Sequence, residues 1–353
     1  MNFIDVETCM KIGVLGFAHG HVNMYCAQWK QQAAMDIELA AGWDHDSRRL
    51  VQAVEEHGLE ACSSPEALCQ RADIDAVVIS AETSLHADLV EQAAAAGKAI
   101  ILQKPMALTL EDADRIVAAV ETAQVPFTMA WQMRVDPENL QIRQLIDSGT
   151  LGRIYQVRRR HCLGVLLNEG FESSWHVDPN YNRDIFADDA AHAIDLLYWL
   201  FGSPLTVTAR MTTAHKASMP NDVGVVVFEY AGGMLAEVSS SFACVAGENT
   251  TEIVGEKGVL VQNYGDGPSS DKRFDPQAPS LKWYLRQTGE WAVSQAEAPQ
   301  SQGERIAGLA GPLADFLHGL RPPLATAEEG RQVLRLVLAC YQANETGQRV
   351  DFV

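Results

Sequence analysis

The chain has 353 residues, of which 46 are acidic and 27 basic, giving a formal charge of −19. A negative field of this size repels the phosphate backbone of nucleic acids and anionic lipid surfaces, so we expect neither as a partner. Hydrophobic residues at 47% and charged residues at 21% are ordinary for a globular protein, and no run approaches the roughly 20 apolar residues of a membrane span.

The length predicts two domains. The seven cysteines are scattered without C-x-x-C spacing, which argues against a disulfide framework or a structural zinc site. The first ten residues also lack the basic and then apolar pattern of a secretory signal. We therefore expect a cytoplasmic protein.

The first part of the chain alternates short apolar runs with longer amphipathic stretches. This rhythm is typical of repeated βαβ units and predicts an α/β fold with a doubly wound parallel sheet. Helices are expected between the strands, for example Ser84–Ala96, which ends at Gly97, and Leu110–Thr122, which begins after Thr109. The expected strands are Lys11–Gly16, Ile37–Trp43, Ala76–Ser80, Ala99–Leu102 and Pro126–Ala130.

After about residue 150 the runs follow one another as consecutive strands, which favours an open, mostly antiparallel sheet. We expect a long loop over Gly265–Ser280 and a final helix over Glu328–Thr346. The predicted domains are therefore 1–133 and 134–353, with the last helix able to pack back on the first domain. The expected strands are Ile154–Arg160, Leu205–Thr212, Val223–Tyr230, Met234–Phe242 and Thr251–Val254.

The turn after the first strand lies where a dinucleotide-binding fingerprint belongs. Glycines there allow a tight turn and a close approach of a pyrophosphate to a helix N-terminus. The run Gly16-Phe17-Ala18-His19 keeps the first glycine, but Ala18 and His21 replace the second and third. An ordinary strand-to-helix turn therefore remains an alternative.

Asp44 ends the second expected strand, where a carboxylate can accept hydrogen bonds from the adenosine ribose of NAD and repel a 2′-phosphate. NAD is therefore the expected cofactor. Arg48 and Arg49 follow closely and could bind a 2′-phosphate, which keeps NADP open. Alternatively, Asp44 and Asp46 simply cap the next helix.

Lys104 directly follows the strand Ala99–Leu102, at the strand end that faces the ligand in a doubly wound sheet. It is therefore a candidate for contact with the substrate or the nicotinamide. A solvated surface charge is the alternative.

Asp188 and His192 are four residues apart at the start of an apolar helix, with Asp195 three residues further on. Residues at this spacing share one helix face, where a carboxylate can orient an imidazole and raise its basicity. Helix capping by Asp188 or Asp189 and a buried structural His192 remain alternatives. No metal is expected, because two carboxylates and one histidine lack a further clustered ligand.

Taken together, these clusters resemble the Gfo/Idh/MocA family, named after glucose-fructose oxidoreductase, inositol dehydrogenase and a rhizopine catabolism protein. The resemblance covers nearly the whole chain. The segments that carry it are Asp75–Ser80, Thr83–Ala87, Gly97–Ala107, Trp131–Arg134, Gly149–Ile154, Trp175 with Asp178-Pro179, Asp188 with His192 and Asp195, Glu252–Gly255, Lys257-Gly258 and Glu345–Gly347.

The resemblance implies an N-terminal Rossmann domain and a C-terminal α/β domain that forms a homodimer or homotetramer. It implies hydride transfer between NAD(P) and a sugar or polyol, with no metal. Lys104 would touch the nicotinamide ribose and the reacting hydroxyl, His192 would be the general acid/base, and Asp188 would bind substrate or orient His192. The implied cofactor-binding residues are Gly16, Phe17, Ala18, His19, Asp44, Ala81, His86, Gln103 and Lys104, and the substrate-binding residues are Trp175, Arg183, Asp188 and His192.

Two other functions stay open: an NAD-dependent glycosidase that oxidises a sugar transiently, and a non-catalytic NAD-binding regulator. The chain also departs from the family pattern, since Gln103 replaces the usual Glu and Ala190 replaces a common Gly. Arg183 stands where the family has a glycine run, and a guanidinium can hold a carboxylate through two parallel hydrogen bonds. We therefore hypothesise that the substrate carries an acidic group.

Overall fold

The computed structural model describes residues 9–245, 249–263 and 279–352. It contains two compact units, Met1–Ala130 with Ile306–Arg331 and Trp131–Arg305 with Gln332–Val353. Residues 264–278, which hold most of the loop expected over Gly265–Ser280, lie outside the described part of the chain.

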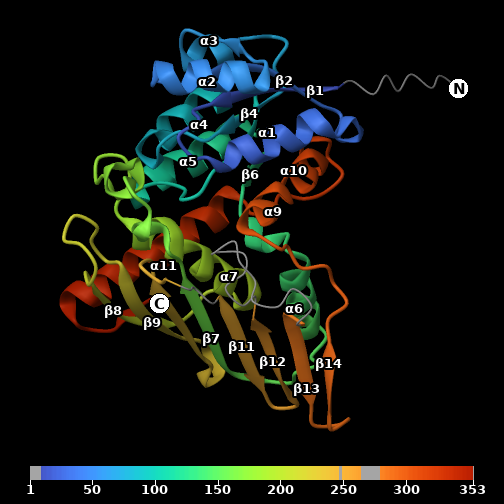
Figure 1. The fold of residues 1–353 in the computed structure, drawn as a ribbon, viewed down its shortest axis with the longest axis vertical. Helices are drawn as coiled ribbons and strands as arrows, with labels where there is room; N and C mark the ends of the chain where they lie inside the picture. The colour runs from blue at the N-terminus through green and yellow to red at the C-terminus, as the bar shows by residue number, and fades with distance from the viewer. Residues whose placement is uncertain (1–8, 246–248, 264–278, 353) are drawn as a thin grey trace, which may run out of the picture. The chain divides into compact units, whose positions relative to one another are not determined.

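The first unit contains a sheet of six strands in the order β3-β2-β1-β4-β5-β6, and every neighbouring pair in it is parallel (Figure 1). The chain starts in the middle of this sheet and winds outward in both directions, which confirms the predicted doubly wound fold. The strands are β1 Met10–Leu15, β2 Ile37–Trp43, β3 Glu60–Ala61, β4 Ala76–Ile79, β5 Ala99–Leu102 and β6 Phe127–Met129.

Buried apolar runs explain these strands. All four residues of β4 are buried, as expected for a strand that helices cover on both faces of a parallel sheet. The predicted bounds of β2 and β5 agree with the structure, those of β4 differ by one residue at one end, and those of β1 and β6 differ by one residue at each end. β3 was not predicted, because two exposed residues at the sheet edge carry no hydrophobic pattern.

The helices of the first unit begin where the sequence provides caps. The Thr109 hydroxyl accepts the Asp112 N–H at 3.1 Å, as predicted, and Asp46 accepts the Arg48 N–H at 2.8 Å. The α-helices are α1 His21–Gln31, α2 Ser47–His57, α3 Pro65–Cys69, α4 His86–Ala95, α5 Leu110–Ala123 and α10 Ala310–Leu317. Short 3-10 helices lie at Ala33–Met35 (η1) and Thr83–Leu85 (η2).

A segment from the far end of the sequence completes this unit. The buried indole of Trp29 on α1 donates to the Ala310 carbonyl at 2.9 Å, which ties α1 to α10. The Leu324 N–H donates to the Thr128 hydroxyl at 2.8 Å, and Met129 N–H donates to the Ala325 carbonyl at 3.0 Å. Residues 306–331 therefore cover part of α1 and the open edge of β6.

The second unit contains a sheet of nine strands in the order β14-β13-β12-β11-β7-β10-β9-β8-β15. Among its neighbouring pairs, β7 and β10 are parallel and the others are antiparallel, which confirms the predicted open, mostly antiparallel sheet. The strands are β7 Ile154–Cys162, β8 Thr206–Thr212, β9 Val223–Glu229, β10 Leu235–Ser241, β11 Thr250–Gly255, β12 Gly258–Asn263, β13 Leu281–Leu285, β14 Glu290–Val293 and β15 Val350–Asp351.

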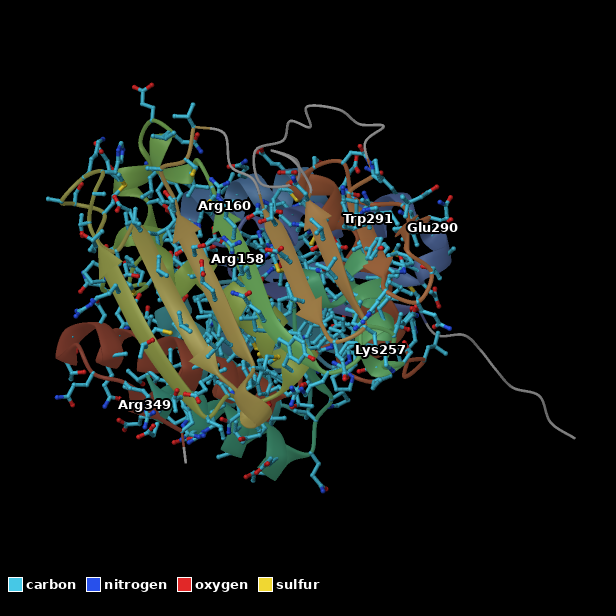
Figure 2. All side chains as sticks on the ribbon, turned by 90° about the horizontal axis from the view of Figure 1, so that it is seen from below. Arg158, Arg160, Lys257, Glu290, Trp291 and Arg349 are labelled. Carbon is cyan, nitrogen blue, oxygen red and sulfur yellow. The ribbon has the colours of Figure 1, made fainter. Side chains whose placement is uncertain are left out.

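The central strand β7 alternates between two faces. Arg158 and Arg160 are exposed (Figure 2), whereas Val157, Arg159 and His161 are buried. Arg159 does not share the exposed face of Arg158 and Arg160, because neighbouring residues of a strand point to opposite sides. The Arg159 guanidinium instead donates to the Thr251 hydroxyl of β11 at 2.8 Å.

Helices cover the buried face of this sheet, with α6 bonded to β12 through Asn139 and Gln262 and α11 bonded to β8 through Asn344 and Met211. In the described residues, no helix has the length and apolar character to cross a bilayer. The helices are α6 Pro137–Asp147, α7 Ala191–Phe201, α9 Gln302–Ala307 and α11 Ala327–Thr346, with a π-helical turn Phe186–Ala190 (η7) and short 3-10 helices Gln132–Arg134, Val165–Leu167, Phe171–Ser173, Trp175–Val177 and Ala231–Gly233.

Candidate functional site

The turn after β1 packs so closely on the segment after β4 that it requires a glycine. Gly16 has φ +87°, and a Cβ added there would lie 2.4 Å from the Ala81 Cα, so only glycine fits. α1 begins at His21 with no side-chain cap and no acidic residue in its first turn. The Val22 and Asn23 N–H groups donate to the His19 and Gly20 carbonyls at 3.2 and 3.3 Å, and the positive dipole end of the helix suits an anion.

His19 ties this turn to the end of β4. Its N–H donates to the Ser80 carbonyl at 3.0 Å, and the Ser80 hydroxyl donates back to the His19 carbonyl at 2.9 Å. The His19 side chain is buried, and its ring lies 4.2 Å from the His21 ring in an edge-on contact. Together with Ala18, these residues form the loop between β1 and α1.

The Asp44 carboxylate at the end of β2 is buried and accepts several hydrogen bonds. The backbone N–H groups of Phe17 and Asp46 each donate to it at 2.7 Å. Arg49 donates to both of its oxygens, at 3.1 Å and 2.9 Å, and also to Glu82 at 2.8 Å. The structure therefore places Asp44 beside the turn after β1, as expected for a ribose-binding carboxylate, and pairs it with Arg49.

His86 joins the loops that follow β4 and β5. Its two ring nitrogens lie 3.1 Å from the Ala81 carbonyl and 3.2 Å from the Met106 carbonyl. Burial lowers the pKa of His86, although these carbonyl contacts favour the charged form. The imidazole is therefore a fixed link between Ala81 and the segment that carries Lys104.

Gln103 and Lys104 are both buried at the carboxyl end of β5. The Gln103 amide donates to the phenol oxygen of Tyr25, and its carbonyl oxygen accepts the Lys104 N–H at 3.0 Å. Burial raises the pKa of Tyr25, so the phenol stays protonated. Gln103 stands where the family pattern has an acidic residue. Its neutral amide is hydrogen-bonded at both ends, to Tyr25 and to the Lys104 N–H.

In the second unit, Asp188 lies in the π-helical turn η7, directly before α7. One of its oxygens lies 2.9 Å from His176 Nδ1, so a histidine that the sequence did not single out is its partner. Trp175 stacks on His176 with ring centroids 4.0 Å apart. Trp175 and Asp188 are therefore brought together through His176, and the role of Asp188 toward His192 stays a prediction.

His192 is buried on α7 within a cluster of polar side chains. The Asp189 Oδ1 atom lies 3.6 Å from His192 Nε2 and 3.7 Å from His161 Nε2. The Gln132 amide nitrogen lies 3.3 Å from His192 Nε2. Burial lowers the pKa of His161, against the opposing effect of Asp189, so this second imidazole favours the neutral form.

Sequence reasoning did not assign roles to His161, His176 and Gln132, and it considered Asp189 only as a cap. One signal could have found His161, since the alternation along β7 puts it on the buried face with Val157. Asp189 could have been noticed because it precedes His192 by three residues, a spacing that also brings side chains together on a helix. Gln132 lies in the segment Trp131–Arg134 that carries part of the family resemblance, whereas no pattern in the sequence points to His176.

Asp195, the third residue of the predicted helix cluster, pairs with Arg134. The Arg134 Nη2 atom donates to Asp195 Oδ1 at 2.7 Å, and Nε lies 3.1 and 3.2 Å from the two carboxylate oxygens. The side chains are 2% and 0% exposed, so the ion pair is fully buried. It fixes α7 to the segment around Gln132.

Arg183 is exposed, and its guanidinium carbon lies 4.9 Å from the centre of the Tyr341 ring. The Tyr341 hydroxyl donates to the buried Asp184, which also accepts the Asn221 amide at 2.7 Å. Burial raises the pKa of Asp184, while these hydrogen bonds oppose the shift. Asp184 and Asn221 thus hold the Tyr341 ring that Arg183 contacts.

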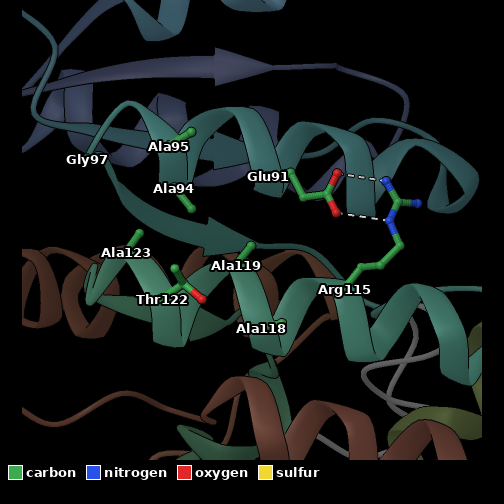
Figure 3. A pocket seen from close by; sticks show the side chains of 9 residues that line it. All are labelled: Glu91, Ala94, Ala95, Gly97, Arg115, Ala118, Ala119, Thr122 and Ala123. Atoms are coloured by element: carbon green, nitrogen blue, oxygen red, sulfur yellow. Dashed lines mark hydrogen bonds and ion pairs between the residues drawn. The ribbon is translucent and has the colours of Figure 1, made fainter.

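A groove of about 710 Å³ lies between α4 and α5 (Figure 3). Ala94, Ala95 and Ala118 are among its lining residues, and Arg115 pairs with Glu91 at one end at 2.8 and 3.0 Å. The groove extends to Gly97, which precedes β5, so it lies toward the amino ends of the strands. Ligands of doubly wound sheets bind at the carboxyl ends, and the groove is not part of the candidate site.

In the ranges that the structure describes, no three His, Cys, Asp or Glu side chains are grouped so that they could hold a metal ion. The expected absence of a metal stays a prediction.

Two family models match the chain. One, described as an oxidoreductase family with an NAD-binding Rossmann fold, matches residues 10–131, and the other, the GFO/IDH/MocA C-terminal domain, matches residues 139–261. Together they cover more than half of the chain.

Named relatives match most of the chain. A D-apiose dehydrogenase of Paraburkholderia graminis is 27% identical, over 89% of this chain and 83% of the relative. An inositol 2-dehydrogenase of Burkholderia lata is also 27% identical, over 96% of this chain and 95% of the relative. An oxidoreductase from Agrobacterium radiobacter, solved with NAD+, L-tartaric acid and magnesium, has a TM-score of 0.82 at 21% identity over 98% of both chains, which shows a common fold.

The buried ion pair of Arg134 with Asp195 generates a stability prediction. Asp195→Asn removes the buried negative charge that faces Arg134, and we expect a loss of about 3–5 kcal/mol in the free energy of unfolding. The matched control is Asp147→Asn, which breaks the exposed pair with Arg143 and should cost less than about 1 kcal/mol. Urea denaturation measures both, and an equal, small effect would contradict the structural role of the buried pair.

Proposed function

The chain belongs to the GFO/IDH/MocA family of NAD-binding oxidoreductases, and we propose that it transfers a hydride between NAD and a hydroxyl-bearing carbon of a sugar, an inositol or a related polyol. The observation that carries this proposal is that both halves of the chain match the two domain models of one oxidoreductase family. The substrate class is supported by the relatives, which are named D-apiose and inositol dehydrogenases. The comparisons give no support to a glycosidase or to a non-catalytic regulator.

The described residues of the first unit fit a dinucleotide. Gly16 and the uncapped start of α1 suit the pyrophosphate, together with Phe17, Ala18 and His19 of the same turn. Asp44 would bind the adenosine ribose. Ala81 and His86 follow β4, and Gln103 and Lys104 follow β5. We assign these four residues to the nicotinamide half of the cofactor. NAD is favoured over NADP because the Asp44 carboxylate repels a 2′-phosphate and Arg49 is already paired with Asp44.

When bound, NAD accepts the hydride from the substrate carbon or returns it. We assign His192 to hold the hydroxyl proton in the oxidation direction, because its buried imidazole lies beside the Asp189 carboxylate, which stabilises the imidazolium. The Lys104 ammonium polarises the substrate oxygen. Asp188 and Trp175, linked through His176, would bind the substrate hydroxyls.

A spectrophotometric screen at 340 nm tests the activity. We expect NADH to accumulate when the protein meets NAD with a panel of sugars, inositols and sugar acids, and we expect less product with NADP. Cleavage of glycosides without net NADH would support the glycosidase instead. Binding of NAD with no turnover on any member of the panel would contradict the proposal.

The same assay tests the two catalytic residues. Lys104→Ala and His192→Ala should each lower kcat by about 10²–10⁴-fold, the usual contribution of a positioned acid or base. His215→Ala, at an exposed histidine of the same unit as His192, is the control and should keep full activity. A His192→Ala protein with wild-type kcat would remove the imidazole from the mechanism.

We also propose that Arg183 binds an acidic group of the substrate, because Arg183 is exposed and its guanidinium carbon lies 4.9 Å from the centre of the buried Tyr341 ring. Arg183→Ala should then lower kcat/KM for sugar acids about ten-fold or more, the value of a charge-assisted hydrogen bond of about 1.5–3 kcal/mol, and leave neutral sugars within about two-fold. Arg183→Lys is the matched control that keeps the charge. Equal effects on acidic and neutral substrates would contradict the hypothesis.

We infer a cytoplasmic homodimer or homotetramer that associates through the exposed face of the nine-stranded sheet. The seven cysteines are all free, which suits a reducing compartment. The exposed side chains of Val225 and Leu235 lie on the adjacent strands β9 and β10 of this face.

Light scattering should give a mass that is a multiple of 38.6 kDa, and the double variant Val225→Glu with Leu235→Glu should have the monomer mass. Leu320→Glu, at an exposed site of the other unit, is the control. A wild-type monomer at micromolar concentration would contradict the inferred oligomer. The cytoplasmic location is tested separately by cell fractionation.

A further inference from the structure

The hydrogen-bonding capacity of the Asp44 carboxylate is fully used by protein groups. Its Oδ1 atom accepts the Asp46 N–H at 2.7 Å and Arg49 Nη2 at 2.9 Å. Its Oδ2 atom accepts the Phe17 N–H at 2.7 Å and Arg49 Nε at 3.1 Å. An ionised carboxylate offers about four lone-pair positions, so these donors occupy all of them. A ribose diol can bind Asp44 only if one of the donors leaves.

Arg49 is the donor that can leave. The other two are backbone N–H groups held by the turn after β1 and by the start of α2, whereas the Arg49 side chain is long and 26% exposed. It also has a second anchor, because its Nη2 atom donates to Glu82 Oε1 at 2.8 Å. The other Glu82 oxygen lies 2.9 Å from His45 Nε2, and the Glu82 side chain is only 3% exposed. Glu82 is therefore a rigid carboxylate to which Arg49 stays bound when it releases Asp44.

We propose that Glu82 is a cofactor-selectivity residue, which draws Arg49 away from Asp44 so that Asp44 can bind the adenosine ribose, and which disfavours a 2′-phosphate. The proposal rests on the proposed position of the adenosine ribose at Asp44. It assigns to Arg49 the role of a side chain that competes with the cofactor, and not that of a ready 2′-phosphate ligand.

The charges of Asp44, Glu82 and Arg49 explain why a 2′-phosphate is disfavoured. Two buried carboxylates, Asp44 and Glu82, share the guanidinium of Arg49, and the exposed His45 lies beside Glu82 and Arg49. A 2′-phosphate that captured Arg49 would leave both carboxylates without their cation in a poorly solvated place. A ribose hydroxyl requires no such exchange, since Arg49 remains on Glu82.

The test measures binding with two ligands that lack nicotinamide, so that catalysis plays no part. Isothermal titration calorimetry with ADP-ribose and with 2′-phospho-ADP-ribose gives two dissociation constants at one pH and one ionic strength. Their ratio, 2′-phospho-ADP-ribose over ADP-ribose, expresses the selectivity. The variants are Glu82→Gln, which removes the charge and keeps the shape, and Arg49→Gln, which removes the competing side chain.

We expect the two variants to move the ratio in opposite directions. Glu82→Gln leaves Arg49 on Asp44 and removes a negative charge, so it should lower the ratio about ten-fold, the value of a hydrogen bond between charged groups. Arg49→Gln frees Asp44 and leaves both carboxylates unpaired, so it should raise the ratio by a similar factor. Arg48→Ala is the control, since this neighbouring arginine is exposed, and it should change the ratio less than three-fold.

The outcomes separate the two levels of the proposal. A wild-type protein that binds neither ligand overturns the dinucleotide site itself, and the inference with it. A wild-type protein that binds ADP-ribose, with a ratio that Glu82→Gln leaves unchanged, overturns the role of Glu82 and leaves the proposed function standing. Circular dichroism checks that each variant folds. If Glu82→Gln does not fold, Arg49→Gln decides, because a loss of affinity that is equal for both ligands overturns the competition.

Discussion

The position of α7 in the second unit depends on the buried ion pair of Arg134 with Asp195. Removing two charges from water is costly, and the pair is tolerated only where its geometry is close to ideal. With both side chains almost fully buried and several hydrogen bonds between them, α7 has little freedom to rotate or slide. His192 lies one turn before Asp195 on α7, while Trp131 and Gln132 lie three and two residues before Arg134. The pair thus holds the Trp131 and His192 rings in an edge-on contact with centroids 5.4 Å apart, and Gln132 beside His192.

The π-helical turn before α7 decides which carboxylate faces which histidine. On a regular α-helix, residues four apart share a face, and this spacing led to the expectation that Asp188 orients His192. The turn Phe186–Ala190 has a different period, and π turns of this kind are frequently found at functional sites. In the structure Asp188 contacts His176, and Asp189 lies between His192 and His161. These two neighbouring acidic residues therefore lie against three different imidazoles, one at Asp188 and two at Asp189.

The sheets could be predicted from the sequence because their strands carry a strong pattern. Buried runs such as β4 and β5 and the alternation along β7 determine where a strand lies and which face is covered. The edge strand β3 was missed because two residues have no period. The positions of Gly16, Asp44 and Lys104 at strand ends were also readable, since the ends of parallel strands follow from the strands themselves.

The side chains that contact Asp44 and Lys104 could not be predicted from the sequence, because they come from other loops and helices. Only the folded chain brings Glu82, after β4, to Arg49 on α2, and this contact turns Arg49 from a free cation into one that two carboxylates share. The same holds for Gln103. Its amide is hydrogen-bonded to Tyr25 on α1, which lies far away in the sequence. Single-sequence patterns reach the residues that carry chemistry more easily than the second layer that orients them.

The first unit is assembled from distant parts of the chain, and this has a consequence for synthesis on the ribosome. Leu324 and Ala325 bond to Thr128 and Met129 on the edge strand β6, and Ala310 accepts the Trp29 indole N–H. When the first 130 residues have left the exit tunnel, the edge of this sheet is still unpaired, and an unpaired edge attracts other strands. The nascent nucleotide-binding unit therefore stays prone to association until nearly the entire polypeptide has been translated. A shortened recombinant version would need residues 306–331 attached to behave as a well-folded protein.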